Sequence, residues 1–216
     1  MLVNFVKLLT VGMKSKNIFL ITTIAAAVAV IFYTSTNEDG TGYNHEIIEE
    51  RKSTDRFMRT STQSPFAGAN ESFKGLQYYP PDINYRIIAG FEPIEQKRTR
   101  MLATSDGAEQ HYREYGYAVF TLEGIENRLL ILESIIPGPL QKKLFLAFGD
   151  ETTARETYGA GRYLDVSHTP GASTITLDFN KAYNPYCAYN DTFSCPLPPA
   201  ENLLNVAIRA GEKSYH

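Results

Sequence analysis

The chain has no tryptophan and only two cysteines and four histidines among its 216 residues. The histidines show no ligand spacing with the cysteines, which argues against a zinc site, and the cysteines do not form the C-x-x-C motif of thiol oxidoreductases. No serine stands in a G-x-S-x-G context, so a Ser/His/Asp triad is not indicated. A formal net charge of −3 offers no basic surface to nucleic acid. The sequence therefore predicts no metal, no cofactor and no nucleic-acid partner.

One long apolar run is present, and it lies near the N-terminus. Residues 17–37 are 21 residues without a charge, and a helix of that length rises about 30 Å, the thickness of the hydrocarbon layer of a membrane. Three lysines precede the run and two acidic residues follow it, so the positive-inside rule keeps the N-terminus in the cytoplasm. We expect a cytoplasmic tail over 1–16, a single transmembrane helix over 17–37, and an extracytoplasmic remainder, periplasmic in a Gram-negative bacterium.

Two alternatives compete with the membrane anchor. A cleaved signal peptide would need a shorter apolar region and an A-x-A-like site, which residues 34–36 match only weakly. A buried core helix fits poorly with the terminal position and the lysines on one side. Initiation at Met13 in place of Met1 would keep two of the lysines and hence the same orientation.

Residues 38–61 are polar, acidic at first and then basic. Glu49 with Lys52, and Asp55 with Arg59, have the spacing of side-chain pairs on a helix. We interpret this segment as a stalk or short helix that precedes an extracytoplasmic domain over 62–216.

The domain itself shows the two-residue periodicity of β-strands. Apolar and polar residues alternate over 173–180 and over 204–209, while 129–132 and 144–148 are continuous apolar runs that suit strands covered on both faces. Turn signals containing glycine or proline separate these segments. Roughly eight or nine short strands with such spacing predict a mainly β fold, a single antiparallel β-sandwich or barrel-like domain with a few short helices.

The segment 178–202 stands apart in composition. It contains both cysteines, four of the eleven prolines and three tyrosines. Such a segment is poor in regular structure but too aromatic for a linker, so we expect a long ordered loop at or beside a functional site.

Cys187 and Cys195 are separated by seven residues. Outside the membrane, in an oxidising compartment, the pair is expected to form a disulfide, and closing a loop of about nine residues would add roughly 2.5 kcal/mol of stability. Two free thiols are the main alternative, and a zinc site is the weaker one.

Three carboxylates are candidates for acid–base catalysis: Asp165, Asp178 and Glu201. Such a role would need one pKa raised by burial or by a like charge. Together with Asn180, the two aspartates could also hold Ca²⁺. The simpler interpretation is that aspartate and asparagine at strand ends bond to nearby backbone and fix turns.

The glycine-containing segment 158–165 lacks the spacing and the lysine of a phosphate loop. Its glycines are expected to allow positive φ in a turn that enters a strand. In that strand Arg162 would share a face with apolar residues and would need a carboxylate partner; binding an acidic ligand group is the alternative. The full set of candidate ligand-binding residues is Tyr158, Arg162, Tyr163, Asn180, Tyr183, Asn184, Tyr189 and Asn202.

Several of these segments occur together in a known family. The segments are FGDET at 148–152, TYGAGRYLD at 157–165, residues 178–189 and CPLPPAEN at 195–202, with weaker similarity at 64–65 and 75–82. In this combination the chain resembles domain-of-unknown-function family 1684, which occurs in bacteria and archaea. The resemblance implies no activity and no catalytic residues.

The leading hypothesis is a membrane-anchored extracytoplasmic β-domain that binds a ligand or an envelope-protein partner near the loop 178–202. A hydrolase that uses the three carboxylates is the first alternative. A structural envelope protein without a small-molecule site is the second.

Overall fold

The computed structural model describes residues 40–68, 73–138 and 141–216. The predicted tail and transmembrane helix, over 1–37, lie outside these residues. Within the described ranges, no helix is long and apolar enough to cross a membrane. The chain forms two compact units, Met1–His45 and Glu46–His216, and the fold below is that of the second unit.

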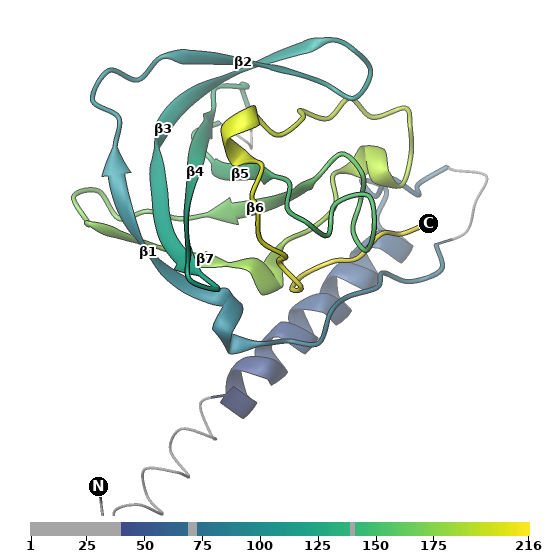
Figure 1. Ribbon diagram of the computed structural model, residues 1–216. Coiled ribbons are helices and arrows are strands. Elements are labelled where there is room, and N and C mark those ends of the chain that lie inside the picture. The colour runs from purple at the N-terminus through teal and green to yellow at the C-terminus, as the bar shows by residue number, and fades with distance from the viewer. Residues whose placement is uncertain (1–39, 69–72, 139–140) are drawn as a thin grey trace, which may run out of the picture. The chain divides into compact units, whose positions relative to one another are not determined.

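One curled antiparallel sheet of seven strands, a half-barrel, forms the centre of this unit (Figure 1). Its order is β6-β5-β4-β3-β1-β7, and β2 pairs with the part of β3 that precedes the β1 contact. The single sheet replaces the two packed sheets of a sandwich. The strands are β1 (Arg86–Pro93), β2 (Thr99–Ala103), β3 (Glu109–Leu122), β4 (Ile125–Ser134), β5 (Leu144–Phe148), β6 (Arg162–Val166) and β7 (Thr174–Asp178).

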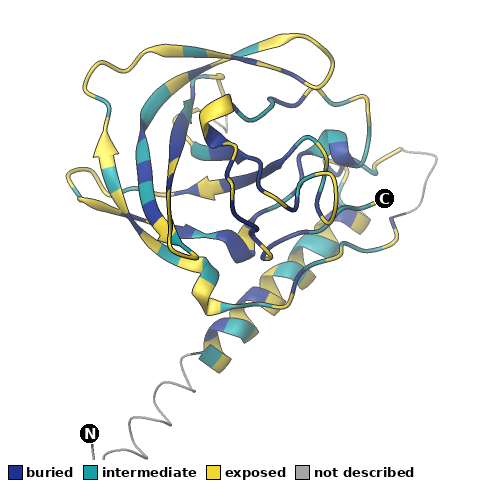
Figure 2. Ribbon diagram, in the orientation of Figure 1, coloured by how far each residue is buried: buried dark blue, intermediate teal, exposed yellow. Residues whose placement is uncertain are grey.

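Strand β4 is buried on both faces over residues 129–132 (Figure 2), as its continuous apolar run predicts. In β4, Leu129 and Ile131 belong to the main core, while Leu130 and Leu132 pack into a second cluster on the opposite face. All four side chains have no exposed surface. The main core is therefore on one face of the sheet, and the second face carries a smaller, aromatic-rich apolar layer.

The prediction of a strand over 204–209 is wrong. Leu204, Val206 and Ile208 are buried in the main core as their alternation indicates, but the segment is not a strand. Leu204 and Val206 form backbone hydrogen bonds with Gly149 and Glu151, which follow β5. Beyond them, the buried guanidinium of Arg162 donates to the carbonyl oxygens of Ile208 and Ala210. The alternation therefore correctly predicted that one side of this segment is buried against the sheet. Such burial does not require the segment to be a strand of that sheet.

A helix covers residues 40–60, in the segment for which the sequence predicts a stalk or short helix. Its part within the second unit buries Ile47 and Met58. Arg51 Nη1 donates to the carbonyl oxygen of Tyr79 at 2.8 Å, and Asp55 Oδ1 accepts from the amide of Leu76 at 3.1 Å. The described helical turns are completed by η1 (Ile83–Tyr85), η2 (Phe179–Lys181), η3 (Tyr186–Ala188) and η4 (Ala200–Asn202).

Candidate functional site

A cleft of about 990 Å³ opens between the second face of the sheet, the helix and the loop 178–202. We call it the aromatic cleft, after the rings that line it. From the sheet and the loop these are Tyr112, Phe145, Tyr163, Tyr183, Tyr186, Tyr189 and Phe193.

Four of the rings form a continuous row across the sheet. The ring centroids of Tyr112 and Phe145 are 5.0 Å apart, those of Phe145 and Tyr163 5.7 Å, and those of Tyr163 and Tyr183 5.9 Å. The row arises because the side chains of one face alternate along β3, β5 and β6. Tyr183 joins the row because its backbone pairs with that of Tyr163 in an isolated bridge.

Two further large apolar side chains line the cleft: Phe57, on the helix, and Ile136, after β4, each of which is 37% exposed. The helix also contributes polar side chains to the lining, namely Glu50, Arg51, Ser53 and Thr54. Large apolar side chains that open into a concavity are costly to keep in water, so this surface favours an apolar occupant.

A few polar groups interrupt the apolar lining. Asp165 is exposed on β6 directly opposite Phe145, and its Oδ1 accepts the hydroxyl of Tyr183 at 2.8 Å. Burial, followed by the charge of Asp165, raises the pKa of Tyr183, so the phenol stays protonated. Lys143 is exposed directly before β5 and lines the same cleft. The cleft therefore holds Asp165 and Lys143 on its sheet side, and Glu50, Arg51, Lys181 and Glu212 line it as well.

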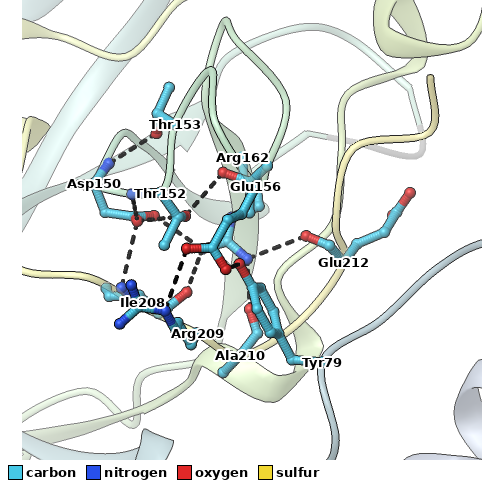
Figure 3. A network of polar contacts seen from close by, with 11 residues as sticks. Tyr79, Asp150, Thr152, Thr153, Glu156, Arg162, Ile208, Arg209, Ala210 and Glu212 are labelled. Atoms are coloured by element: carbon cyan, nitrogen blue, oxygen red, sulfur yellow. Dashed lines mark hydrogen bonds and ion pairs between the residues drawn. The ribbon is translucent and has the colours of Figure 1, made fainter.

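Beside the cleft, Arg162 organises a buried polar network (Figure 3). Its side chain is 1% exposed, and Nη2 lies 2.9 Å from Oδ2 of Asp150. Gly161, with φ +85°, turns the chain into β6; a side chain there would meet the carbonyl oxygen of Phe148 at 2.5 Å. The buried Arg162 thus has the carboxylate partner that the sequence analysis requires, and it contacts no open surface.

Glu212 adjoins the same network (Figure 3) and also reaches the floor of the cleft. Its carboxylate accepts from the Tyr189 hydroxyl at 2.6 Å, from the amide nitrogen of Asn184 at 3.1 Å and from its side-chain nitrogen at 2.8 Å. Burial raises the pKa of Glu212 to about 7, against the opposing effect of these hydrogen bonds. Glu212 is therefore a buried carboxyl group that can exchange a proton near neutral pH.

Cys187 and Cys195 lie side by side as free thiols. The backbone amide of Cys187 donates to Sγ of Cys195 at 3.2 Å. The predicted disulfide is absent from this structure, although the two cysteines are neighbours. Cys195 lines the aromatic cleft and is buried, whereas Cys187 does not line the cleft and is half-buried.

Only some of the candidate ligand-binding residues meet in one place. Tyr163, Tyr183 and Tyr189 line the aromatic cleft, and so does Asn180, whose side chain is held by the backbone of Asp82. The remaining four have other partners: Tyr158 contacts Cys187, Arg162 pairs with Asp150, Asn184 binds Glu212, and Asn202 binds backbone of β4 and β5.

The three candidate catalytic carboxylates are not brought together. Asp165 alone among them lines the aromatic cleft. Asp178 caps η2 by accepting from the amide of Asn180 at 3.2 Å, and Glu201 pairs with Arg100. The described residues thus give the hydrolase hypothesis no convergent pair among these three, and they contain no cluster of metal-binding side chains.

Sequence reasoning missed half of the cleft. Tyr112 and Phe145 are aromatic residues in segments with strand character, but they lie more than 30 residues before the loop 178–202, on which the site prediction rests. Phe57 and Ile136 carried no signal, because nothing in their local pattern shows that helix and sheet meet there. Glu212 was missed for the same reason, because its local pattern does not show which parts of the chain it contacts.

Two comparisons with known proteins place the chain. It is 35% identical to an uncharacterised protein of Haloarcula marismortui with a known solution structure; the match covers 83% of this chain and all of that one, with a TM-score of 0.63. No functionally curated protein matches the chain. The model of the family described as "Protein of unknown function (DUF1684)" matches residues 71–213. The chain therefore belongs to the DUF1684 family, as its motifs indicated.

Proposed function

We propose that the protein binds a small organic molecule in the aromatic cleft, and that this molecule has a mainly apolar, ring-containing body with at least one polar group. The observation that carries the proposal is the row of four rings, continuous with a cleft of about 990 Å³. That volume suits a small-molecule site, which is typically concave and apolar with few polar groups.

The geometry suits rings better than flexible chains. Centroid separations of 5.0–5.9 Å are those of favourable tilted and edge-to-face packing, and a further ring can extend the same series. Asp165 and Lys143 would select the polar group: Asp165 accepts hydrogen bonds, and Lys143 donates them. The preformed lining lowers the entropic cost of binding.

The test uses anilinonaphthalene sulfonate, a fluorescent probe with aromatic rings and one anionic group. A fragment over 40–216 is suitable, because the Haloarcula marismortui relative folds in solution without any part outside the matched region. We expect saturable binding to the native fragment. Phe57→Ser and Ile136→Ser should each weaken it about tenfold, since each removes roughly half of a buried apolar side chain from the complex.

Ile88→Ser is the matched control. Ile88 is 75% exposed on β1 and does not line the cleft, so the variant should bind the probe as the wild type does. Circular dichroism must show that all variants are folded, because partly unfolded proteins also bind this probe. Equal weakening by all three substitutions, or no binding by the native fragment, would refute the proposal.

We further propose that residues 17–37 anchor this domain in a membrane, with residues after about 38 outside the cytoplasm. The uncharged run and the lysines that precede it support the proposal. Protease added to spheroplasts that express the full chain should digest the domain. Complete protection, with digestion after lysis, would overturn this topology.

A further inference from the structure

The two cysteines are arranged asymmetrically. Sγ of Cys187 receives the hydroxyl of Tyr158 at 3.8 Å. The Cys195 thiol and Ser105 are polar neighbours that also favour its thiolate, while the Ser105 hydroxyl itself donates to the carbonyl oxygen of Phe193 at 3.3 Å. The three groups come from three separate parts of the chain: the turn before β6, the loop and the β2–β3 connection. Ser105 is fixed there because its amide donates to the carbonyl oxygen of Cys195 at 2.9 Å. Cys187 therefore sits among polar groups that the fold holds in place.

Such polar neighbours stabilise a thiolate. The neighbouring Cys195 thiol, together with Ser105 and Tyr158, lowers the pKa of Cys187 to about 6. The pKa of Cys195 is raised, because its proton is held by the Cys187 sulfur and because the site is buried. At neutral pH the pair thus holds one proton between two sulfurs, and the more exposed sulfur carries the charge.

We propose that Cys187 and Cys195 form a thiol–disulfide exchange site that reduces small organic disulfides, with Cys187 as the attacking sulfur and Cys195 as the resolving one. This role does not rest on the function proposed for the aromatic cleft, although Cys195 lines that cleft.

The exchange has two steps. The Cys187 thiolate attacks one sulfur of R–S–S–R; a Cys187–S–S–R bond forms, the small S–S bond breaks and R–S⁻ leaves. Cys195 then gives up its proton and attacks Sγ of Cys187, so that the intramolecular disulfide forms and a second R–S⁻ leaves. One leaving group takes up the proton that Cys195 released, and the other takes up a proton from water. The protein is oxidised and the small disulfide is reduced to two thiols.

The first test measures which sulfur reacts and at what pH. The reduced full chain is alkylated with iodoacetamide over a range of pH, and each cysteine-containing peptide is quantified by mass spectrometry. Cys187 should be modified with a midpoint near pH 6, about 2 pH units or more below the midpoint of the unfolded chain. Cys195 should stay unmodified over the same range. A midpoint for Cys187 equal to that of the unfolded chain would overturn the proposal.

The second test traps the intermediate with hydroxyethyl disulfide as the probe. Wild-type protein should lose two hydrogens and carry no adduct. Cys195→Ser should accumulate the mixed disulfide on Cys187, at about pH 8 to compensate for the lost hydrogen bond. Cys187→Ser should accumulate far less adduct, because its remaining thiol is buried and keeps its proton.

Two further results of this test would refute the proposal. One is equal adduct formation by the two serine variants, which would show that neither sulfur has the attacking role. The other is a disulfide that resists reduction in the folded wild type, which would make the bond structural. Circular dichroism distinguishes either result from misfolding of a variant.

Discussion

Nη2 of Arg162 lies 2.9 Å from Oδ2 of Asp150, and both side chains are 1% exposed. The same guanidinium donates to the carbonyl oxygens of Ile208, Ala210 and Glu212. Asp150 in turn accepts from the amide of Ile208 at 3.3 Å. This buried ion pair therefore fastens the C-terminal segment to the sheet, in addition to the backbone hydrogen bonds that Leu204 and Val206 form with Gly149 and Glu151.

Asp150→Asn should lower the free energy of unfolding by about 3 kcal/mol or more, because it leaves the charge of Arg162 buried without a counterion. Urea unfolding followed by circular dichroism measures the change. Arg209→Gln is the control from the same network, since the Arg209–Glu156 pair is exposed and its loss should change stability little. Equal effects of the two substitutions would contradict the role given to Asp150.

Asn202→Ala should destabilise the sheet by about 3 kcal/mol or more. The Asn202 side chain, 0% exposed, accepts from the amide of Leu130 at 2.7 Å and donates to the carbonyl oxygens of Leu130 and Ala147 at 3.0 and 2.9 Å. The three backbone groups lose their partners, at about 1–3 kcal/mol each. Exposed Asn205→Ala, measured in the same way, should change stability by less than about 0.5 kcal/mol.

Glu212 should make the folded state less stable as the pH rises. Its pKa is about 7 in the folded protein, against 4.5 for an ordinary glutamate, so the folded protein holds this proton to a higher pH than the unfolded chain does. This contribution to stability is complete below pH 4.5 and is lost as the pH rises through 7, on the order of 3 kcal/mol in total.

In Glu212→Gln this contribution should be missing. Urea unfolding of both proteins between about pH 4.5 and 8 gives the difference in their free energies of unfolding at each pH. That difference should change in favour of the variant as the pH rises, even if the variant is less stable throughout because an amide faces Asn184. If the difference in the free energy of unfolding stayed the same at every pH, the raised pKa would not belong to Glu212.

Tyr158→Phe should raise the pKa of Cys187, since it removes the hydroxyl that donates to Sγ. The midpoint of the alkylation profile should move to higher pH, with Cys187 still reacting before Cys195. Tyr117→Phe, which removes a phenol hydroxyl from β3, serves as the control and should leave the profile in place. An unchanged profile in Tyr158→Phe would exclude the tyrosine from thiolate stabilisation.

Local patterns predicted those parts of the fold that depend on local chemistry. The apolar run 129–132 was correctly interpreted as a strand buried on both faces, and a glycine, Gly161, does have positive φ at the turn into β6. In β6 the alternation placed Arg162 on the face of Leu164, and the structure confirms it. These predictions succeed because periodicity and backbone sterics act within a few residues.

The candidate site was predicted less completely, because long-range contacts decide it. The loop lines the cleft through Tyr183 and Tyr189, and Tyr163 lines it from β6. Asn202, also a candidate for ligand binding, binds the backbone of β4 and β5, because a polar residue that satisfies distant buried backbone has the same local pattern as one that faces a ligand.

The sequence by itself determined a mainly β domain, its family and the proximity of the two cysteines, because each is encoded by periodicity, by motifs or by short separation along the chain. Tertiary structure decided that Tyr112 and Phe145 continue the row begun by Tyr163, and that Asp150 is the partner of Arg162. It also placed Tyr158 and Ser105 around Cys187. Such pairings depend on which strands lie side by side and on how the sheet curls, and no local pattern carries that information.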